Sequence, residues 1–313
     1  MKLKALSHYK GDLDTRFGDC ILVYDSSRLI VYDCGHSRHE ESIKSFLRDH
    51  KSVSTVYIVV SHNDSDHTNG ICALLQWLSE CGYTSSVYSH QYLRHVDTIL
   101  DKIDDGRRNR ETLKRALLDV FNNIREIIET AREYGIPTYE ALSGVSFAGA
   151  SIVGPSVDEF TDVAAKAVDS RATDRIGSGL AEENVMNAAS VQLKCSLDDV
   201  GLILLCGDAT PDYMKNLEDY SLIQLPHHGQ KDDAIAVFNR LGGVAYSKKY
   251  LISDNTGSGA NSGGSEKLTM YMKQENYSPA YNTKNGIVEL PGVLSHTSTS
   301  SQRRNFLGDL DSI

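Results

Sequence analysis

Four side chains that commonly bind metal ions lie within one short stretch of the sequence: His62, Asp64, Asp66 and His67. Imidazole nitrogens and carboxylate oxygens suit Zn²⁺, Mn²⁺ or iron, and the stretch contains no cysteine for a thiolate site. It follows residues 55–61 (TVYIVVS), a continuous apolar run that predicts a strand buried on both faces. Because the end of a buried strand is rigid and the following loop lets alternate side chains converge, we predict a metal site here.

Three segments of the chain resemble, in the same order, motifs of the metallo-β-lactamase superfamily. The family signature is His-x-His-x-Asp-His, and this chain has His-x-Asp-x-Asp-His with Asp64 at the position of the second histidine. Residues 202–208 (LILLCGD) are similar to the family's strand that ends in a metal-bridging aspartate, here Asp208. Residues 225–231 (LPHHGQK) resemble a segment of one subgroup, the hydrolase domain of the competence protein ComEC.

The resemblance implies an α+β fold, a four-layer αββα sandwich, with a centre for two divalent metal ions. One ion would be held by His62, Asp64 and Asp208, and the other by Asp66, His67, Asp208 and His228. The hard anionic oxygen of Asp64 favours Mn²⁺ or mixed metals over zinc alone, so zinc and manganese both stay open.

The two adjacent histidines of the last motif are nearly equivalent at the level of sequence. We prefer His228 as the metal ligand and His227 as a proton donor. Asp66 is also the candidate for orienting the attacking water. The predicted catalytic residues are therefore Asp66 and His227.

Two weaker features agree with the same subgroup. Gly18-Asp19-Cys20 and residues 31–35 (VYDCG) look like its early Gly-Asp and Ile-Asp-x-Gly strands, and Asp33 would orient a metal ligand. Residues 187–193 (NAASVQL) look like its Asn-rich entry to a strand. Many family members carry a metal-binding histidine in that region and this chain has none, so Asn187 or water would complete the first metal site.

The hydrophobic periodicity divides the chain into a body and additional segments. Residues 1–291 form the predicted domain, and 292–313 form a polar tail. Within the domain, residues 91–134 show apolar residues at spacings of three and four and predict an inserted helical hairpin, either a packed cover over the sheet or a lid or dimer surface. Residues 156–186 are small and polar, and we predict a long loop there.

Composition limits the class of protein. The chain has 313 residues and a formal net charge of −10, which argues against a general nucleic-acid coat but not against a nuclease whose metal ions attract phosphate. The six cysteines include no C-x-x-C pair, and we expect reduced core thiols. The N-terminal residues lack an apolar signal core and no stretch is long enough to cross a bilayer, so we expect no membrane association and a cytoplasmic location.

The predicted function is metal-dependent hydrolysis by a water activated between two ions, with a phosphodiesterase or nuclease as the first interpretation. A small-molecule hydrolase, such as a lactonase or cyclic-nucleotide phosphodiesterase, and a non-catalytic regulatory module that binds a protein partner are the alternatives. The substrate would be nucleic acid or a small phosphodiester. Basic residues at the turn of the insertion could contact phosphates or form only a solvated face: Arg107, Arg108, Arg110, Lys114 and Arg115. The same insertion is compatible with a homodimer.

Overall fold

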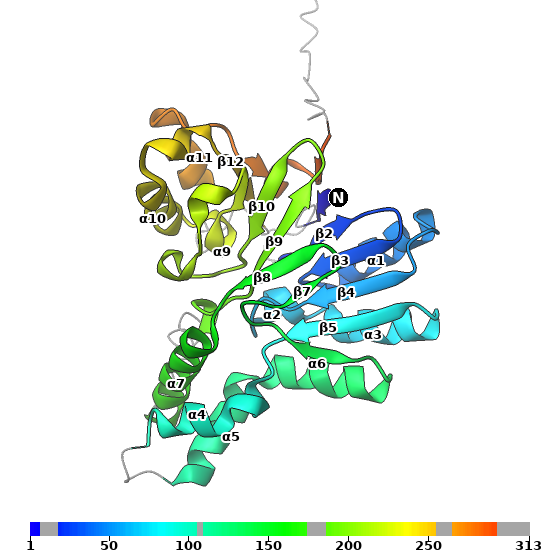
Figure 1. Cartoon of the computed structure of the whole chain (residues 1–313), viewed down its shortest axis with the longest axis vertical. Coiled ribbons are helices and arrows are strands. Elements are labelled where there is room, and N and C mark those ends of the chain that lie inside the picture. The colour runs from blue at the N-terminus through cyan, green and yellow to red at the C-terminus, as the bar shows by residue number, and fades with distance from the viewer. Residues whose placement is uncertain (7–17, 105–108, 174–185, 255–264, 293–313) are drawn as a thin grey trace, which may run out of the picture.

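Two seven-stranded sheets lie face to face in the computed structural model, with helices on the outer side of each (Figure 1). The structure describes residues 1–6, 18–104, 109–173, 186–254 and 265–292. The first sheet has the strand order β14-β1-β2-β3-β4-β5-β6, and the second has the order β13-β12-β11-β10-β9-β8-β7. The described part of the chain therefore has four layers, as the resemblance implied.

The strands of the first sheet are β1 (Lys2–Ala5), β2 (Ile21–Tyr24), β3 (Arg28–Tyr32), β4 (Thr55–Val59), β5 (Thr84–Ser89), β6 (Thr138–Glu140) and β14 (Val288–Leu290). Those of the second are β7 (Ser146–Phe147), β8 (Ala150–Gly154), β9 (Gln192–Leu197), β10 (Gly201–Leu205), β11 (Leu222–Gln224), β12 (Lys249–Ile252) and β13 (Tyr281–Asn282). β3, β4, β5 and β6 pair in parallel, as do β10, β11, β12 and β13. Parallel strands bring their carboxyl ends to one edge of each sheet.

Alternate residues of the central strands enter different layers of the core. In β3, Ile30 and Tyr32 pack between the two sheets, whereas Leu29 and Val31 pack against the outer helices. In β10, Ile203 lies between the sheets and Leu204 faces the helices of the second sheet. Both faces are apolar because both are covered, which explains the continuous apolar runs.

Helices cover the outer face of each sheet. Over the first sheet lie α1 (Ser37–Asp49), α3 (Ile71–Glu80) and α6 (Asn122–Glu133), all of which contribute apolar side chains to one cluster. Over the second lie α10 (Lys231–Leu241) and α11 (Ser265–Gln274). The sequence predicts helices over residues 38–49, 70–80, 231–241 and 266–275, and α1, α3, α10 and α11 confirm them. Within the described part of the chain, no helix combines the length and apolar character that crossing a bilayer would require.

The predicted insertion consists of a 3₁₀ turn (Tyr92–His95) and three helices, α4 (Val96–Asp101), α5 (Arg110–Val120) and α6. α4 and α5 contact each other, while α6 follows α5 after a break at Phe121 and packs on α3. The turn between α4 and α5, with Arg107 and Arg108, lies outside the described residues.

The prediction of a loop over residues 156–186 is wrong for its first part, because Val157–Thr173 forms α7. α7 packs against α4 and α5, and the three helices lie together beside one end of the sandwich (Figure 1). The sequence carries the signal of this helix in Ser156 and Glu159, which form a capping box: the Ser156 amide donates to Glu159 Oε2 at 2.9 Å, and the Glu159 amide donates to Ser156 Oγ at 3.3 Å. The apolar face of α7 consists largely of alanines, so the hydrophobic periodicity of this helix is weak. Residues 174–185, the rest of the predicted loop, lie outside the described residues.

The six cysteines, for which reduced core thiols were predicted, form no disulfide within the described residues, and Cys81 is exposed rather than part of the core. Cys20, Cys34, Cys195 and Cys206 are buried, as expected of thiols that act as small apolar side chains.

Candidate metal centre

The loop with the four clustered ligands is held by unusually close backbone packing. After β4 the chain enters the one-turn helix α2 (Ser65–Thr68), and the amide of Asp19 donates to the carbonyl of Asp66 at 2.9 Å. A Cβ atom on Gly18 would lie 1.6 Å from that carbonyl oxygen, and one on Gly35 would lie 1.7 Å from it. Only glycine permits this approach, so the Gly-Asp and Asp-x-Gly motifs serve to clamp the ligand loop.

His67 is oriented by a buried carboxylate. Its Nδ1 lies 2.8 Å from Asp33 Oδ2, and the other oxygen of Asp33 accepts a hydrogen bond of 2.7 Å from the amide of Ser61. Asp33 has a left-handed backbone conformation (φ 61°) at the end of β3, which turns its side chain toward the loop. The Nε2 atom of His67 consequently points to Asp208, 3.6 Å from its Oδ1.

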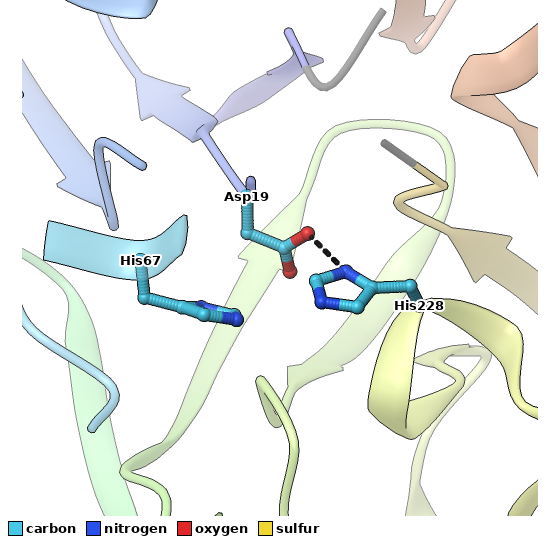
Figure 2. A group of neighbouring side chains, drawn as sticks. All are labelled: Asp19, His67 and His228. Atoms are coloured by element: carbon cyan, nitrogen blue, oxygen red, sulfur yellow. Dashed lines mark hydrogen bonds and ion pairs between the residues drawn. The ribbon is translucent and has the colours of Figure 1, made fainter. Parts of the chain in front are cut away.

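His228 is oriented in the same way by Asp19. Its Nδ1 lies 2.9 Å from Asp19 Oδ1, and Figure 2 shows this carboxylate beside the rings of both His67 and His228. Asp19 Oδ2 accepts hydrogen bonds from Gln224 Nε2 at 2.9 Å and Ser253 Oγ at 2.8 Å. Asp19 precedes β2 and its partners belong to the second sheet, so this network joins the two sheets at the site.

The inner nitrogen of His228 faces carboxylate oxygens from both motifs. Its Nε2 lies 3.3 Å from Asp66 Oδ2 and 3.7 Å from Asp208 Oδ2. Asp208 follows β10 and lies between His67 and His228, one oxygen toward each. Ligand atoms of Asp208 and His62 also lie within 4.8 Å of each other, so Asp208 is close to both sets of candidate ligands.

His62 has a different environment. Its Nδ1 lies 2.9 Å from Ser61 Oγ and 3.3 Å from Ser190 Oγ, so hydroxyl groups take the place that carboxylates have beside the other imidazoles. Its Nε2 lies 3.5 Å from Asp64 Oδ2. His62 and Asp64 therefore face each other, as expected for two ligands of one ion.

His227 lies at the rim of the site. Its Nδ1 lies 2.8 Å from Asp233 Oδ2, and its Nε2 lies 3.4 Å from Asn187 Nδ2 and 3.9 Å from Asp208 Oδ2. Both histidines of the pair have left-handed backbones, with φ of 50° and 53°, which costs about 1–2 kcal/mol per residue. The side chain of His227 is 21% exposed and that of His228 is 10% exposed. The geometry thus separates the pair into an inner His228 and an outer His227.

Neighbouring carboxylates and imidazoles of the site shift one another's pKa toward the charged form. Burial disfavours the charged form of His67, yet the carboxylates of Asp208, Asp33 and Asp66 hold its pKa well above the ordinary value. Burial likewise opposes ionisation of Asp208, but the neighbouring imidazoles of His228 and His67 keep its pKa well below the ordinary value. Anionic carboxylates and protonated imidazoles thus stabilise one another, and a divalent cation can replace the protons.

Unpartnered buried atoms test whether the residues fit a metal ion. At the site, four such atoms of the described residues make no hydrogen bond: His62 Nε2, His67 Nε2, Asp208 Oδ1 and Asn187 Oδ1. A buried polar atom without a partner is costly unless a ligand satisfies it. Ligand atoms of His62, His67 and Asp208 lie within 4.8 Å of one another, and so do those of Asp19, His67 and His228. The residue set fits divalent cations.

The structure brings all the sequence-predicted site residues to one place, and it adds several that the sequence did not single out. Asp19 appeared only as part of a weak motif, whereas it orients His228. Ser190, which contacts His62, likewise appeared only within the weak motif 187–193. Asp233, which contacts His227, was not predicted, because a lone Asp on a helix is common and carries no signal.

No protein-family model and no curated protein matches this chain. A candidate metallo-beta-lactamase from Thermotoga maritima is structurally similar over 62% of this chain and 70% of its own, at 10% identity and a TM-score of 0.33. The metallo-beta-lactamase fold protein YhfI from Bacillus subtilis is similar over 92% of this chain and 98% of its own, at 10% identity and a TM-score of 0.44. At these scores the likenesses carry no argument by themselves.

The architecture of the chain itself is the stronger observation. Two mixed sheets pack face to face between helical layers, and the ligand loops follow β4, β10 and β11 at one edge. This is the four-layer αββα sandwich that the resemblance to the metallo-β-lactamase superfamily implied. The position of the candidate centre at the strand ends agrees with that fold.

Proposed function

We propose that the protein is a metal-dependent hydrolase that cleaves phosphodiester bonds. The observation that carries the proposal is the central position of Asp208. It shares a group of ligand atoms within 4.8 Å of one another with His62 and His67, and its Oδ2 lies 3.7 Å from His228 Nε2. A carboxylate between two sets of inward-facing ligands suits a pair of divalent ions.

Two groups of residues would hold the ions. His62, Asp64 and Asp208 would hold one, and Asp66, His67, Asp208 and His228 would hold the other. Two such ions, when bound, lower the pKa of water and stabilise the attacking and leaving oxygens of a phosphodiester. The carboxylate-rich ligand set favours Mn²⁺ beside Zn²⁺.

Two side chains near the ions would act on water and on the leaving group. Asp66 is half-buried and has its Oδ2 toward His228, where the second oxygen could orient the attacking water. His227 is held at Nδ1 by Asp233, so that its Nε2 faces the site from the rim. From there it could donate a proton to the departing oxygen.

The described basic residues of the insertion give limited support to a long nucleic-acid substrate. The guanidinium of Arg110 is engaged by Asp101 at 2.9 Å and Asp97 at 2.8 Å, and Lys114 contacts Glu111 at 3.4 Å. Phosphate contacts would have to compete with these carboxylates. We therefore propose the phosphodiester bond as the reacting group and treat the size of the substrate as an outcome of the test.

The test is hydrolysis of bis(p-nitrophenyl) phosphate, single-stranded DNA, a cyclic dinucleotide and a lactone by the protein with Mn²⁺ or Zn²⁺. We expect Asp208→Asn to lose phosphodiester hydrolysis by at least about 10³-fold, because the shared ligand is lost. Asp212→Asn, a change in an exposed carboxylate four residues further along, is the matched control and should behave as the unmodified protein.

The outcomes separate the alternatives. Cleavage of the lactone alone would replace the proposal with a small-molecule hydrolase. Binding of metal without turnover of any of the four substrates, or an Asp208→Asn variant with undiminished activity, would contradict it and favour a regulatory module. Cleavage of DNA or of the cyclic dinucleotide would define the substrate size.

A further inference from the structure

The first turn of α6 makes a set of hydrogen bonds with the middle of the ligand loop. Asn63 lies between the candidate ligands His62 and Asp64, and its Oδ1 accepts from the backbone amides of Asn123 at 3.1 Å and Ile124 at 3.0 Å. Its Nδ2 donates to Asn122 Oδ1 at 2.9 Å. In return, Asn123 Nδ2 donates to the carbonyl of Asn63 at 2.6 Å.

These contacts cap the N-terminus of α6, a role that a residue next to the helix in sequence normally fills. The first amides of a helix have no partner within it, and the residue before the helix usually caps them. The residue before α6 is Phe121, which makes no side-chain cap. Asn63 supplies that cap from a segment some sixty residues earlier in the chain. The helix and the loop therefore satisfy each other's hydrogen-bonding groups.

The direction of Asn63 decides where its neighbours point. Asn63 is directed at α6, where its Oδ1 accepts from two backbone amides. Its neighbours His62 and Asp64 face the centre instead, where His62 Nε2 lies 3.5 Å from Asp64 Oδ2.

The carboxylate of Asp64 has little other support. Within the described residues its oxygens make no hydrogen bond, and the contact with His62 is its only ion pair. α6, in contrast, is fixed by Ile124, Ile127 and Ala131, which are buried against the first sheet's helical layer. The well-packed helix α6 thus supports the loop that carries Asp64, a ligand that is otherwise held only by its backbone.

We propose that Asn63 is a positioning residue that presents His62 and Asp64 to one metal ion by docking the ligand loop on the first turn of α6. The inference rests on the proposed function, since it concerns the same centre. It makes α6, the last helix of the predicted insertion, part of the scaffold of one half of the centre.

The experiment is Mn²⁺ titration of the full chain, followed by equilibrium dialysis and electron paramagnetic resonance. We expect Asn63→Ala to bind the ion held by His62 and Asp64 about 10- to 100-fold less tightly than the unmodified protein does. The affinity for the other ion should change little. The spectrum of this variant at moderate Mn²⁺ should show a mononuclear signal where the unmodified protein shows a coupled pair. Asn123→Ala, which removes only the donor to the Asn63 carbonyl, should shift the same ion in the same direction by less.

The matched control is Asn109→Ala. Asn109 caps α5 by accepting from the amide of Glu111 at 2.8 Å, so its loss also weakens a helix start but does not involve the ligand loop. It should bind both ions normally. If Asn63→Ala does not fold, Asn123→Ala against Asn109→Ala carries the comparison.

Three results would count against the inference. Two ions bound with unchanged affinity in Asn63→Ala and Asn123→Ala would overturn it while the proposed function stands. Equal weakening of both ions would also overturn it, because Asn63 would then not serve one half. An unmodified protein that binds no Mn²⁺ or Zn²⁺ would overturn the inference and the proposed function together.

Discussion

In the half of the centre formed by Asp66, His67 and His228, buried carboxylates orient both imidazoles, whereas hydroxyl groups orient His62 in the other half. A carboxylate beside the outer nitrogen fixes the ring and makes the inner nitrogen a stronger ligand. A hydroxyl does so more weakly. Asp64 adds a ligand that is 18% exposed and held by its backbone. The side chains of the first half are therefore held in place before an ion binds, whereas the geometry of the other half depends on the loop that carries His62 and Asp64.

The largest expected effect is the loss of His228 as a ligand in the half of the centre whose imidazoles are oriented by carboxylates, called here the carboxylate-oriented half. His228→Asn should bind the ion of that half more than about 100-fold less tightly, because an inward-facing nitrogen beside Asp66 and Asp208 is lost. His227→Asn should keep both ions and lose mainly turnover. Metal content after dialysis, measured by mass spectrometry, decides between them. Equal metal loss in both variants would remove the distinction between an inner and an outer histidine.

The next effect compares the groups that orient the imidazoles. Asp19→Asn and Asp33→Asn keep the shape of the side chain but remove the charge, so each should weaken the ion of the carboxylate-oriented half by about 10- to 100-fold. Ser190→Ala removes one 3.3 Å contact to His62 and should weaken the other ion by less than about 10-fold. Titration of each variant with Mn²⁺ gives the affinities. A larger effect for Ser190→Ala would reverse the comparison.

A smaller effect tests the backbone clamp on Asp66. Gly18 and Gly82 both have positive φ, 55° and 75°, but a Cβ on Gly18 would lie 1.6 Å from the Asp66 carbonyl, whereas none of the described atoms lies within 4 Å of one on Gly82. Both alanine variants should lose about 1–2 kcal/mol from the backbone conformation. Gly18→Ala should lose about 1–3 kcal/mol more, and part of the metal affinity.

Thermal unfolding of the two glycine variants measures this difference. Each additional kcal/mol lowers the melting temperature by roughly 2–4 °C in a domain of this size. Equal melting temperatures for Gly18→Ala and Gly82→Ala would show that the loop can move away from the clamp at no cost.

The smallest effect is the pH dependence of stability without metal. The pKa values of His67 and His228 are raised because carboxylates outweigh the effect of burial, so their contribution is complete at acid pH and is lost as pH rises through the raised pKa. The pKa values of Asp66 and Asp208 are lowered, and their contribution is lost only in strong acid. The metal-free protein should therefore melt at a lower temperature at pH 9 than at pH 6, by roughly 2–4 °C for each kcal/mol of stability lost.

Metal should reverse that trend. Imidazoles must lose their protons to bind an ion, so the stabilisation by Mn²⁺ should increase from pH 6 to pH 9. Melting curves with Mn²⁺ and with a chelator across this range measure both slopes. Parallel slopes in the two conditions would show that the imidazoles do not bind the metal.

Local sequence was informative wherever one segment carried its own signal. The apolar run of β4 followed by four ligand side chains predicted both the strand and the place of the site. The body helices were predicted from periodicity in the same way. α7 is an exception with a local reason too, because it is rich in alanine and shows no strong apolar pattern.

The sequence by itself determined the chemistry of the centre: a carboxylate and imidazole set on loops after buried strands, with glycines beside it. Only the tertiary structure decided which histidine faces inward and which residues orient it. Asp19 and His228 are 209 positions apart, and Asn63 and Ile124 are 61 apart, yet each pair is in hydrogen-bond contact. Such pairs leave no trace in local propensity or spacing, because the packing of the two sheets and of α6 brings them together.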